Sequence, residues 1–158
     1  IGTAHTPKGY LSELGAIISA NAKLEISSKS QWDNAGDHAR LFTGDRPGSG
    51  YAFHTGDDKN PWAKIDLGAV KTVNAVEIEN RPNEHRTDGL ILSLSEDGQK
   101  WEEIWRAKQW ESSWVVPVTH FDAGVNAPGR PARYLRVETK GDSPHALMLQ
   151  RITVYGAK

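Results

Sequence analysis

The 158-residue chain contains no cysteine, so disulfide bonds, thiol catalysis and cysteine-ligated zinc are excluded. A chain of this length buries about 70% of the surface that its unfolded form exposes, and it needs neither a disulfide nor a metal to hold its fold. We therefore expect an apolar core alone to stabilise it.

The chain also lacks a surplus of charge of either sign. Its 19 basic and 20 acidic residues give a net charge of −1, whereas a nucleic-acid-binding surface needs a basic surplus on one face. No apolar run reaches the roughly 18 residues of a membrane-spanning helix. We therefore expect neither nucleic-acid binding nor membrane insertion. The chain starts with Ile1 and shows no charged-then-apolar leader, which indicates a processed product or a module cut from a longer protein.

What the sequence does contain is a series of short stretches in which apolar and polar residues alternate. Such alternation predicts strands with one buried face, and Asp97-Gly98 between two of the stretches is typical of a tight turn. Many short strands without a long helix indicate an all-β sandwich or barrel. The predicted strands are residues 22–27, 62–67, 73–80, 90–95, 101–106, 115–118, 134–139 and 147–156.

A long polar loop, residues 31–50, separates the first predicted strand from the others. Irregular loops of this length inside a compact domain are usually functional. The chain shows no internal repeat and no linker. We therefore expect one domain over residues 1–158, in which residues 1–20 form a lead-in segment.

Five sequence segments resemble the coagulation factor V/VIII type C, or discoidin, superfamily, over about residues 20–156. They are residues 60–68 (NPWAKIDLG), 73–78 (VNAVEI), 95–101 (SEDGQKW), 132–137 (ARYLRV) and 152–156 (ITVYG). The resemblance implies a galactose-binding-domain-like jelly-roll sandwich of antiparallel strands, with ligands bound at loops on one end. Members include carbohydrate-binding modules, fucose-binding lectins, phospholipid-binding clotting-factor domains and protein-binding domains, so the fold alone does not fix function.

A narrower resemblance is to the F-type lectins. Those lectins carry a histidine, an Asn-Arg pair at a strand end and a second arginine shortly after. His54, Asn80-Arg81 and Arg86 match these positions. The resemblance implies that the histidine and both arginines hydrogen-bond a sugar. This chain lacks the two adjacent cysteines that the family usually places between the arginines, and its segment is shorter.

The chemistry of these side chains suits a sugar. Arginine offers several donors in a rigid fork, which can hold adjacent hydroxyls, a carboxylate or a sulfate. Histidine adds one oriented donor or acceptor, and Glu84 can accept from a hydroxyl or neutralise an arginine. The alternative is structural: Arg81 pairs with a neighbouring acid, and His54 holds a loop through a backbone carbonyl.

Aromatic side chains supply the apolar platform that a sugar ring needs. Trp32, in the long loop, and then Trp110, in a polar connection that also contains Trp114, are the candidates. The alternative for each is that the ring only plugs the end of the sandwich. Trp62 and Trp101 occupy strand positions that the superfamily fills with core aromatics, and Trp105 is expected to be partly buried.

Many relatives hold a structural calcium ion under the first long loop. Calcium prefers six to eight oxygen ligands, and Asp33, Asn34, Asp37 and Asp45 provide candidates. Calcium-holding members often have glutamate near the start of the last strand, where this chain has Arg151. The alternative is that Arg151 replaces the ion by bonding loop carbonyls.

Two other classes of function remain. Catalysis is not indicated, because the sequence has no phosphate-binding glycine loop, nucleophile elbow or zinc-protease motif. Glu102 and Glu103 point to opposite faces of a strand, and Asp57-Asp58 is typical of a solvated turn. A membrane-binding role would need apolar loop tips with basic neighbours. A protein-interaction or adhesion role is harder to exclude, because polar loops with three tryptophans also suit it.

We predict a non-catalytic carbohydrate-binding module, lectin-like, centred on His54, Arg81 and Arg86. The sugar is either neutral, of the fucose or galactose type, or anionic. A monosaccharide should bind weakly, with Kd on the order of 10⁻⁵–10⁻³ M. We expect pH-dependent binding if neutral His54 contributes. The module is expected to belong to a larger protein, such as a carbohydrate-active enzyme. A bacterial, secreted or cell-surface location fits the lack of cysteine.

Overall fold

The computed structural model describes residues 14–45, 48–83, 85–122 and 124–157. Its elements are β1 (Ala16–Ile17), β2 (Lys23–Ile26), η2 (Ala35–Asp37), α2 (Arg40–Thr43), β3 (Phe53–His54), β4 (Trp62–Asn80), β5 (Ile91–Ser95), β6 (Glu102–Arg106), β7 (Ser113–Pro117), β8 (Thr119–Asp122), β9 (Val125–Pro128), β10 (Arg130–Glu138) and β11 (Met148–Ala157). The all-β prediction is confirmed, and every predicted strand overlaps an observed one.

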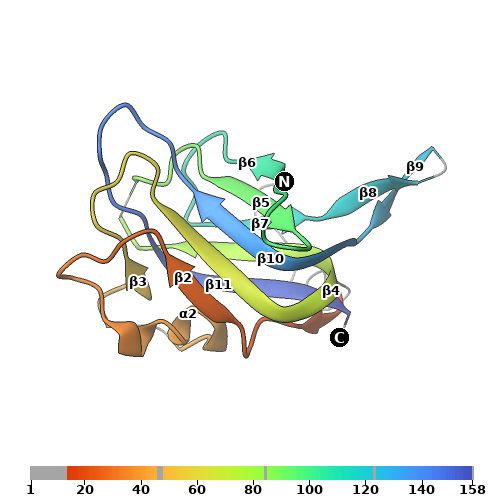
Figure 1. Cartoon of the computed structure of the whole chain (residues 1–158), viewed down its shortest axis with the longest axis horizontal. Helices are drawn as coiled ribbons and strands as arrows, with labels where there is room; N and C mark the ends of the chain where they lie inside the picture. Colours follow the sequence, from red (N-terminus) through yellow and green to blue (C-terminus); the bar gives the residue numbers. More distant parts are fainter. Residues whose placement is uncertain (1–13, 46–47, 84, 123, 158) are drawn as a thin grey trace.

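The longest strand, β4, takes part in both layers of the sandwich (Figure 1). Its first half pairs with β2 and β10, and its second half pairs with β11 and β7. The pairing with β10 continues past the bend as far as Val73. The exposed residues 68–70 separate the two halves. Gly68 has φ of 90°, a left-handed conformation that glycine adopts readily. The predicted strands 62–67 and 73–80 are thus two parts of one bent strand.

All sheet pairings are antiparallel, and the inward side chains of the two layers form the core. In the first half of β4 the alternate residues Ala63, Ile65 and Leu67 are buried. In β10 the alternate residues Leu135 and Val137 are fully buried. The period of two that predicted the strands therefore reflects burial against the opposite layer.

Four observed strands were not predicted. Two of them, β1 and β3, are two residues long and too short to show alternation. The other two, β8 and β9, pair only with each other among the described residues. They extend from the sandwich on the far side from β3 (Figure 1).

Part of the lead-in segment belongs to the sheet, because β1 pairs with β11. The predicted lead-in residues 1–13 lie outside the described residues. Among the described residues, no helix is long and apolar enough to cross a membrane.

The tryptophan predictions need correction. Trp62 and Trp101 were expected in the core, but both are only partly buried and neither belongs to the core cluster. The guanidinium of Arg136 lies 4.4 Å from the Trp101 ring. Trp114 is instead 5% exposed and belongs to the core, because it lies on β7 opposite Ile78 of β4. Trp105 is partly buried, as predicted, and packs edge-on against Trp114.

An ion pair on the outer face of β4 gives the fold an acid-sensitive component. Arg133 donates to both carboxylate oxygens of Asp66, at 2.9 and 3.1 Å. This hydrogen bond holds the pKa of Asp66 below its ordinary value of 3.8. A lowered pKa in the folded state stabilises the fold above the unfolded pKa, and the contribution disappears as pH falls through the folded pKa.

We therefore expect Asp66→Asn to lower the free energy of unfolding at neutral pH by a few tenths to about 1 kcal/mol, since the pair is partly exposed. Urea denaturation at about pH 7 and about pH 2 measures this loss. The difference between variant and wild type should shrink at the lower pH. An equal difference at both pH values would mean that the carboxylate charge of Asp66 contributes nothing.

Candidate functional site

A cavity of about 560 Å³ lies at the loop end of the sandwich. Its lining is polar and aromatic and comes from three separate parts of the chain. These parts are the first long loop, the segment around β3, and the loop after β4. The lining residues are Ser30, Gln31, Trp32, Tyr51, His54, Thr55, Gly56, Asp57, Arg81 and Arg86.

The start of β11 brings two of these parts together. Met148 pairs with His54 of β3, and Leu149 pairs with Asn80, the last residue of β4. Arg81 follows Asn80 directly, and its guanidinium lies 3.2 Å from the sulfur of Met148. His54 and Arg81, which are distant in sequence, therefore both lie beside the start of β11.

His54 is 8% exposed, and its ring is held in one tautomer. Its Nδ1 lies 2.8 Å from the carbonyl oxygen of Thr55 and 2.9 Å from Oγ of Ser30. A carbonyl oxygen can only accept, so Nδ1 carries the proton. In the neutral ring the other nitrogen, Nε2, is then an acceptor. The structural alternative for His54, a bond to a loop carbonyl, is thus observed at Nδ1 and leaves Nε2 for a ligand.

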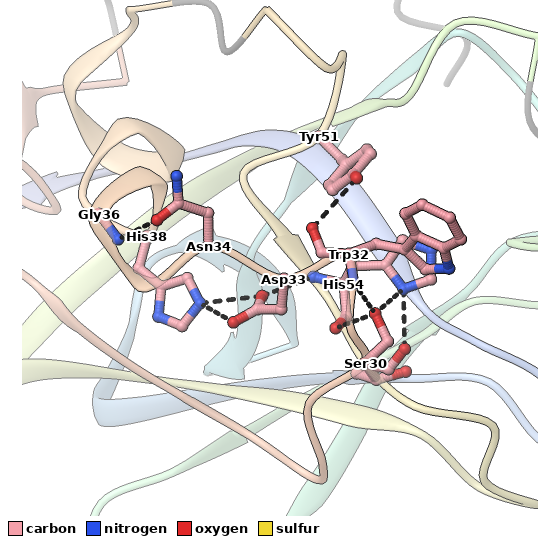
Figure 2. Close-up of polar contacts among 9 residues, drawn as sticks. Ser30, Trp32, Asp33, Asn34, Gly36, His38, Tyr51 and His54 are labelled. Atoms are coloured by element: carbon pink, nitrogen blue, oxygen red, sulfur yellow. Dashed lines mark hydrogen bonds and ion pairs between the residues drawn. The ribbon is translucent and has the colours of Figure 1, made fainter.

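The first long loop is fastened to His54 through Asp33 (Figure 2). Oδ1 of Asp33 accepts from the backbone N–H of His54 at 2.9 Å, and the carboxylate also contacts Nε2 of His38 at 2.9–3.0 Å. The Asp33 side chain is only 2% exposed. The loop wall of the cavity therefore has a defined position relative to the histidine.

Trp32 is 61% exposed, although its backbone is held at both ends. Its N–H donates to Oγ of Ser30 at 3.1 Å, and its carbonyl accepts from the Tyr51 hydroxyl at 3.1 Å. A large exposed ring on a fixed backbone suits the platform role that the sequence predicted.

The two arginines lie on a loop that is tied to its neighbours by Asn80. The side chain of Asn80 donates to the carbonyl of Glu111 at 2.6 Å and accepts from the hydroxyl of Thr87 at 2.8 Å. These contacts fix both ends of the segment that contains Arg81 and Arg86.

The structure brings together four of the six predicted ligand-binding residues: His54, Arg81, Arg86 and Trp32. Glu84 lies outside the described residues. Trp110 is not in the cavity lining, and its ring stacks on His85 at a centroid distance of 4.2 Å.

Six lining residues were not predicted, and four of them lie next to residues that were. Gln31 precedes Trp32, whereas Thr55, Gly56 and Asp57 follow His54 directly. The sequence signal that could have identified these four residues is their position next to a predicted binding residue. Tyr51, three residues before His54, and Ser30 carry no such motif, and only the folded loops reveal them.

The predicted calcium ligands do not converge on one point. The carboxylate of Asp33 hydrogen-bonds the ring of His38 and the backbone N–H of His54. The side chain of Asn34 instead caps the short η2 helix by accepting from the N–H of Gly36 at 3.0 Å.

The other two candidates face elsewhere. Asp37 lies 3.3 Å from Arg40, and Asp45 accepts from the hydroxyl of Thr43 at 3.3 Å. Within the described part of the chain, no three histidine, cysteine or acidic side chains are grouped as a metal site. The four candidate side chains, in this arrangement, therefore do not fit a calcium ion.

A permanent cation also lies beside this loop. The guanidinium of Arg151 is 3.5 Å from where a Cβ on Gly44 would stand, at the end of α2. Its other side faces Glu79 at 3.8 Å. A dication placed beside Arg151 would be repelled.

Calcium is accordingly expected not to stabilise the domain. A site with Kd of about 10 μM would add about 2.7 kcal/mol at 100-fold excess, which raises the Tm by roughly 5–10 °C. We expect a shift below about 1 °C between excess calcium and a chelator in a thermal melt. A calcium-dependent rise of several degrees would show that the loop rearranges to bind the ion.

The comparisons with known proteins agree with this architecture. Residues 25–152 match the family described as F5/8 type C domain. The fold is an antiparallel β-sandwich with a polar cavity at its loops. Since the match covers most of the sequence, the chain belongs to the F5/8 type C domain family. No curated protein sequence matches it.

Solved structures with the same fold share little sequence with this chain. A fucose-binding module of Streptococcus pneumoniae has 18% identity and a TM-score of 0.66, covering 90% of this chain and 96% of that one. A fucolectin from striped bass (Morone saxatilis) has 19% identity and a TM-score of 0.68, and the match covers 88% of this chain and 48% of that one. A chitosan-binding module from a chitosanase/glucanase of Paenibacillus sp. IK-5 has 16% identity and a TM-score of 0.63, and the match covers 89% of this chain and 99% of that one.

Proposed function

We propose that the chain is a non-catalytic carbohydrate-binding module that holds a neutral sugar between His54, Arg81, Arg86 and Trp32. The observation that carries the proposal is the convergence of these side chains in one cavity at the loop end. Arginines supply donors, the exposed indole supplies an apolar face, and Nε2 of His54 supplies an acceptor. The fucose and chitosan ligands named for structurally similar modules support a sugar as the ligand.

The tautomer of His54 favours a neutral sugar over an anionic one. A hydroxyl can donate to Nε2 and accept from an arginine at the same time. A sulfate or carboxylate only accepts, so it meets an acceptor lone pair at neutral His54. Asp57, a second acceptor in the lining, offsets part of the attraction that Arg81 and Arg86 exert on an anion.

The lining also favours binding over catalysis. Glycoside hydrolysis usually requires two carboxyl groups that flank the scissile bond, and Asp57 is the one carboxylate among the described lining residues. Glu102 and Glu103 lie on β6 and pair with Arg130 and Arg106. We accordingly propose an accessory role, as one domain of a larger secreted or cell-surface bacterial protein.

A glycan array with the isolated domain tests the proposal, with Arg81→Ala run in parallel. We expect hits among neutral galactose-type or fucosylated glycans, and no hits for the variant. A folded wild type that binds no glycan would contradict the proposal and favour a protein-interaction role.

A further inference from the structure

The Tyr51 ring lies between the two strongest candidate ligand-binding side chains. Its centroid is 5.1 Å from that of the His54 imidazole, at an interplanar angle of 71°. The guanidinium carbon of Arg81 lies 5.0 Å from the same ring. An edge contact with a histidine and a cation–π contact with an arginine both depend on the position of this one ring.

The Tyr51 hydroxyl fixes a third part of the site. It donates its single proton to the backbone carbonyl of Trp32 at 3.1 Å (Figure 2). This contact joins the segment before β3 to the first long loop. Because the proton is already used, the hydroxyl has none to donate to a sugar.

The other contacts of Arg81 with described residues are also uncharged. Its NH1 lies 3.2 Å from the thioether of Met148. A Cβ on Gly50 would stand 3.5 Å from Cγ of Arg81, and the φ of 84° at Gly50 favours glycine there. An aromatic face, a thioether and a glycine restrict the side chain, and these three contacts do not neutralise its charge.

From this geometry we infer that Tyr51 is a positioning residue, which holds Arg81, His54 and the Trp32 loop in their binding arrangement. The effect of Tyr51 on sugar binding rests on the proposed function. The effect of Tyr51 on the position of Arg81 in the free domain does not depend on the proposed function. The two can therefore be tested separately.

A matched control lies on the outer face of the sheet. The guanidinium of Arg133 lies over the ring of Tyr134 at the same distance, 5.0 Å. Tyr134 is not part of the cavity lining. Tyr134→Leu removes a comparable cation–π contact without touching the site.

The first experiment needs no ligand. In the NMR spectrum of the free domain, the Nε–Hε signal of Arg81 should move downfield in Tyr51→Leu, because the ring no longer shields it. Its heteronuclear NOE should fall as the side chain gains mobility. Tyr51→Phe keeps the ring, so it should leave this signal close to that of the wild type. An unchanged Arg81 signal in Tyr51→Leu would overturn the inference whether or not the domain binds sugar.

The second experiment measures binding to a multivalent sugar probe identified on the array, with folding checked by circular dichroism. We expect Tyr51→Leu to bind about 5–30-fold more weakly, from the cation–π range. Tyr51→Phe should bind about 2–10-fold more weakly, from the lost hydrogen bond. Tyr134→Leu should bind as the wild type does.

A double-mutant cycle separates positioning from direct contact. If Tyr51 acts through Arg81, Tyr51→Leu should cost a smaller factor in the Arg81→Gln background than in the wild type. An equal factor in both backgrounds would show that Tyr51 does not act through Arg81, and this result would overturn the positioning of Arg81 by Tyr51. Absence of wild-type binding contradicts the proposed function, and the NMR result then decides the inference on Tyr51.

Discussion

Arg81→Ala is expected to weaken glycan binding by at least about 100-fold. Net hydrogen bonds to charged groups contribute about 1.5–3 kcal/mol each, and the guanidinium fork of Arg81 can make two. The side chain is already restricted by Tyr51 and Met148, so little rotamer entropy is lost on binding. For a ligand with Kd near 10⁻⁴ M, such a loss moves binding beyond the range of calorimetry.

Arg106→Ala is the matched control for this prediction. Arg106 is an exposed arginine that pairs with Glu103 on the outer face of β6, outside the cavity lining. The control should bind sugar with wild-type affinity, and both variants should keep wild-type circular dichroism. If Arg81→Ala retains binding within about threefold, the side chain is a structural arginine and the site lies elsewhere.

The second large effect is the loss of the acceptor at His54. With Nδ1 bound to the carbonyl oxygen of Thr55, Nε2 is the nitrogen that can accept from a sugar hydroxyl. His54→Leu removes this acceptor. Binding of a neutral sugar should therefore weaken by about 10-fold for the lost hydrogen bond.

An anionic glycan would not lose this contact, because a sulfate or carboxylate only accepts. The His54→Gln variant is the control, because its amide keeps one acceptor oxygen. Its affinity is expected to fall less than that of His54→Leu. Wild-type affinity in His54→Leu would remove His54 from the sugar contacts.

Much of the sandwich could be predicted because burial follows a period of two. The alternation of apolar and polar residues predicted strands at 62–67 and 73–80. It did not predict that they form one strand, β4, because residues 68–70 between them are all exposed. The strand β3 could not be predicted from two residues. Its existence depends on pairing with β11, which is far away in sequence.

Three residues of the candidate site could be named from the sequence for a different reason. His54, Arg81 and Arg86 were identified by resemblance to a spaced motif, and β11 brings the first two together. Tyr51 belongs to no such motif. Its role depends on three contacts that form only when the loops are folded.

The arrangement of the calcium candidates could not be predicted, because a sequence shows which oxygens are present but not which partners they bind. Asp33 and Asp37 lie on the loop where an ion was expected, but their carboxylates face His38 and Arg40. Such pairings follow from the path of the η2 and α2 segments. The composition of the loop does not reveal them.

The most direct test of the central claim is an NMR titration of the isolated domain with the monosaccharide at the end of the best array hit. Backbone and indole signals report where the sugar binds. We expect saturable shifts at the Trp32 indole, the His54 amide and the Arg81 side chain, and little change elsewhere. Shifts grouped instead at the second surface cavity, which Trp101 and Arg130 line, would contradict the account and move the sugar site away from the predicted loops.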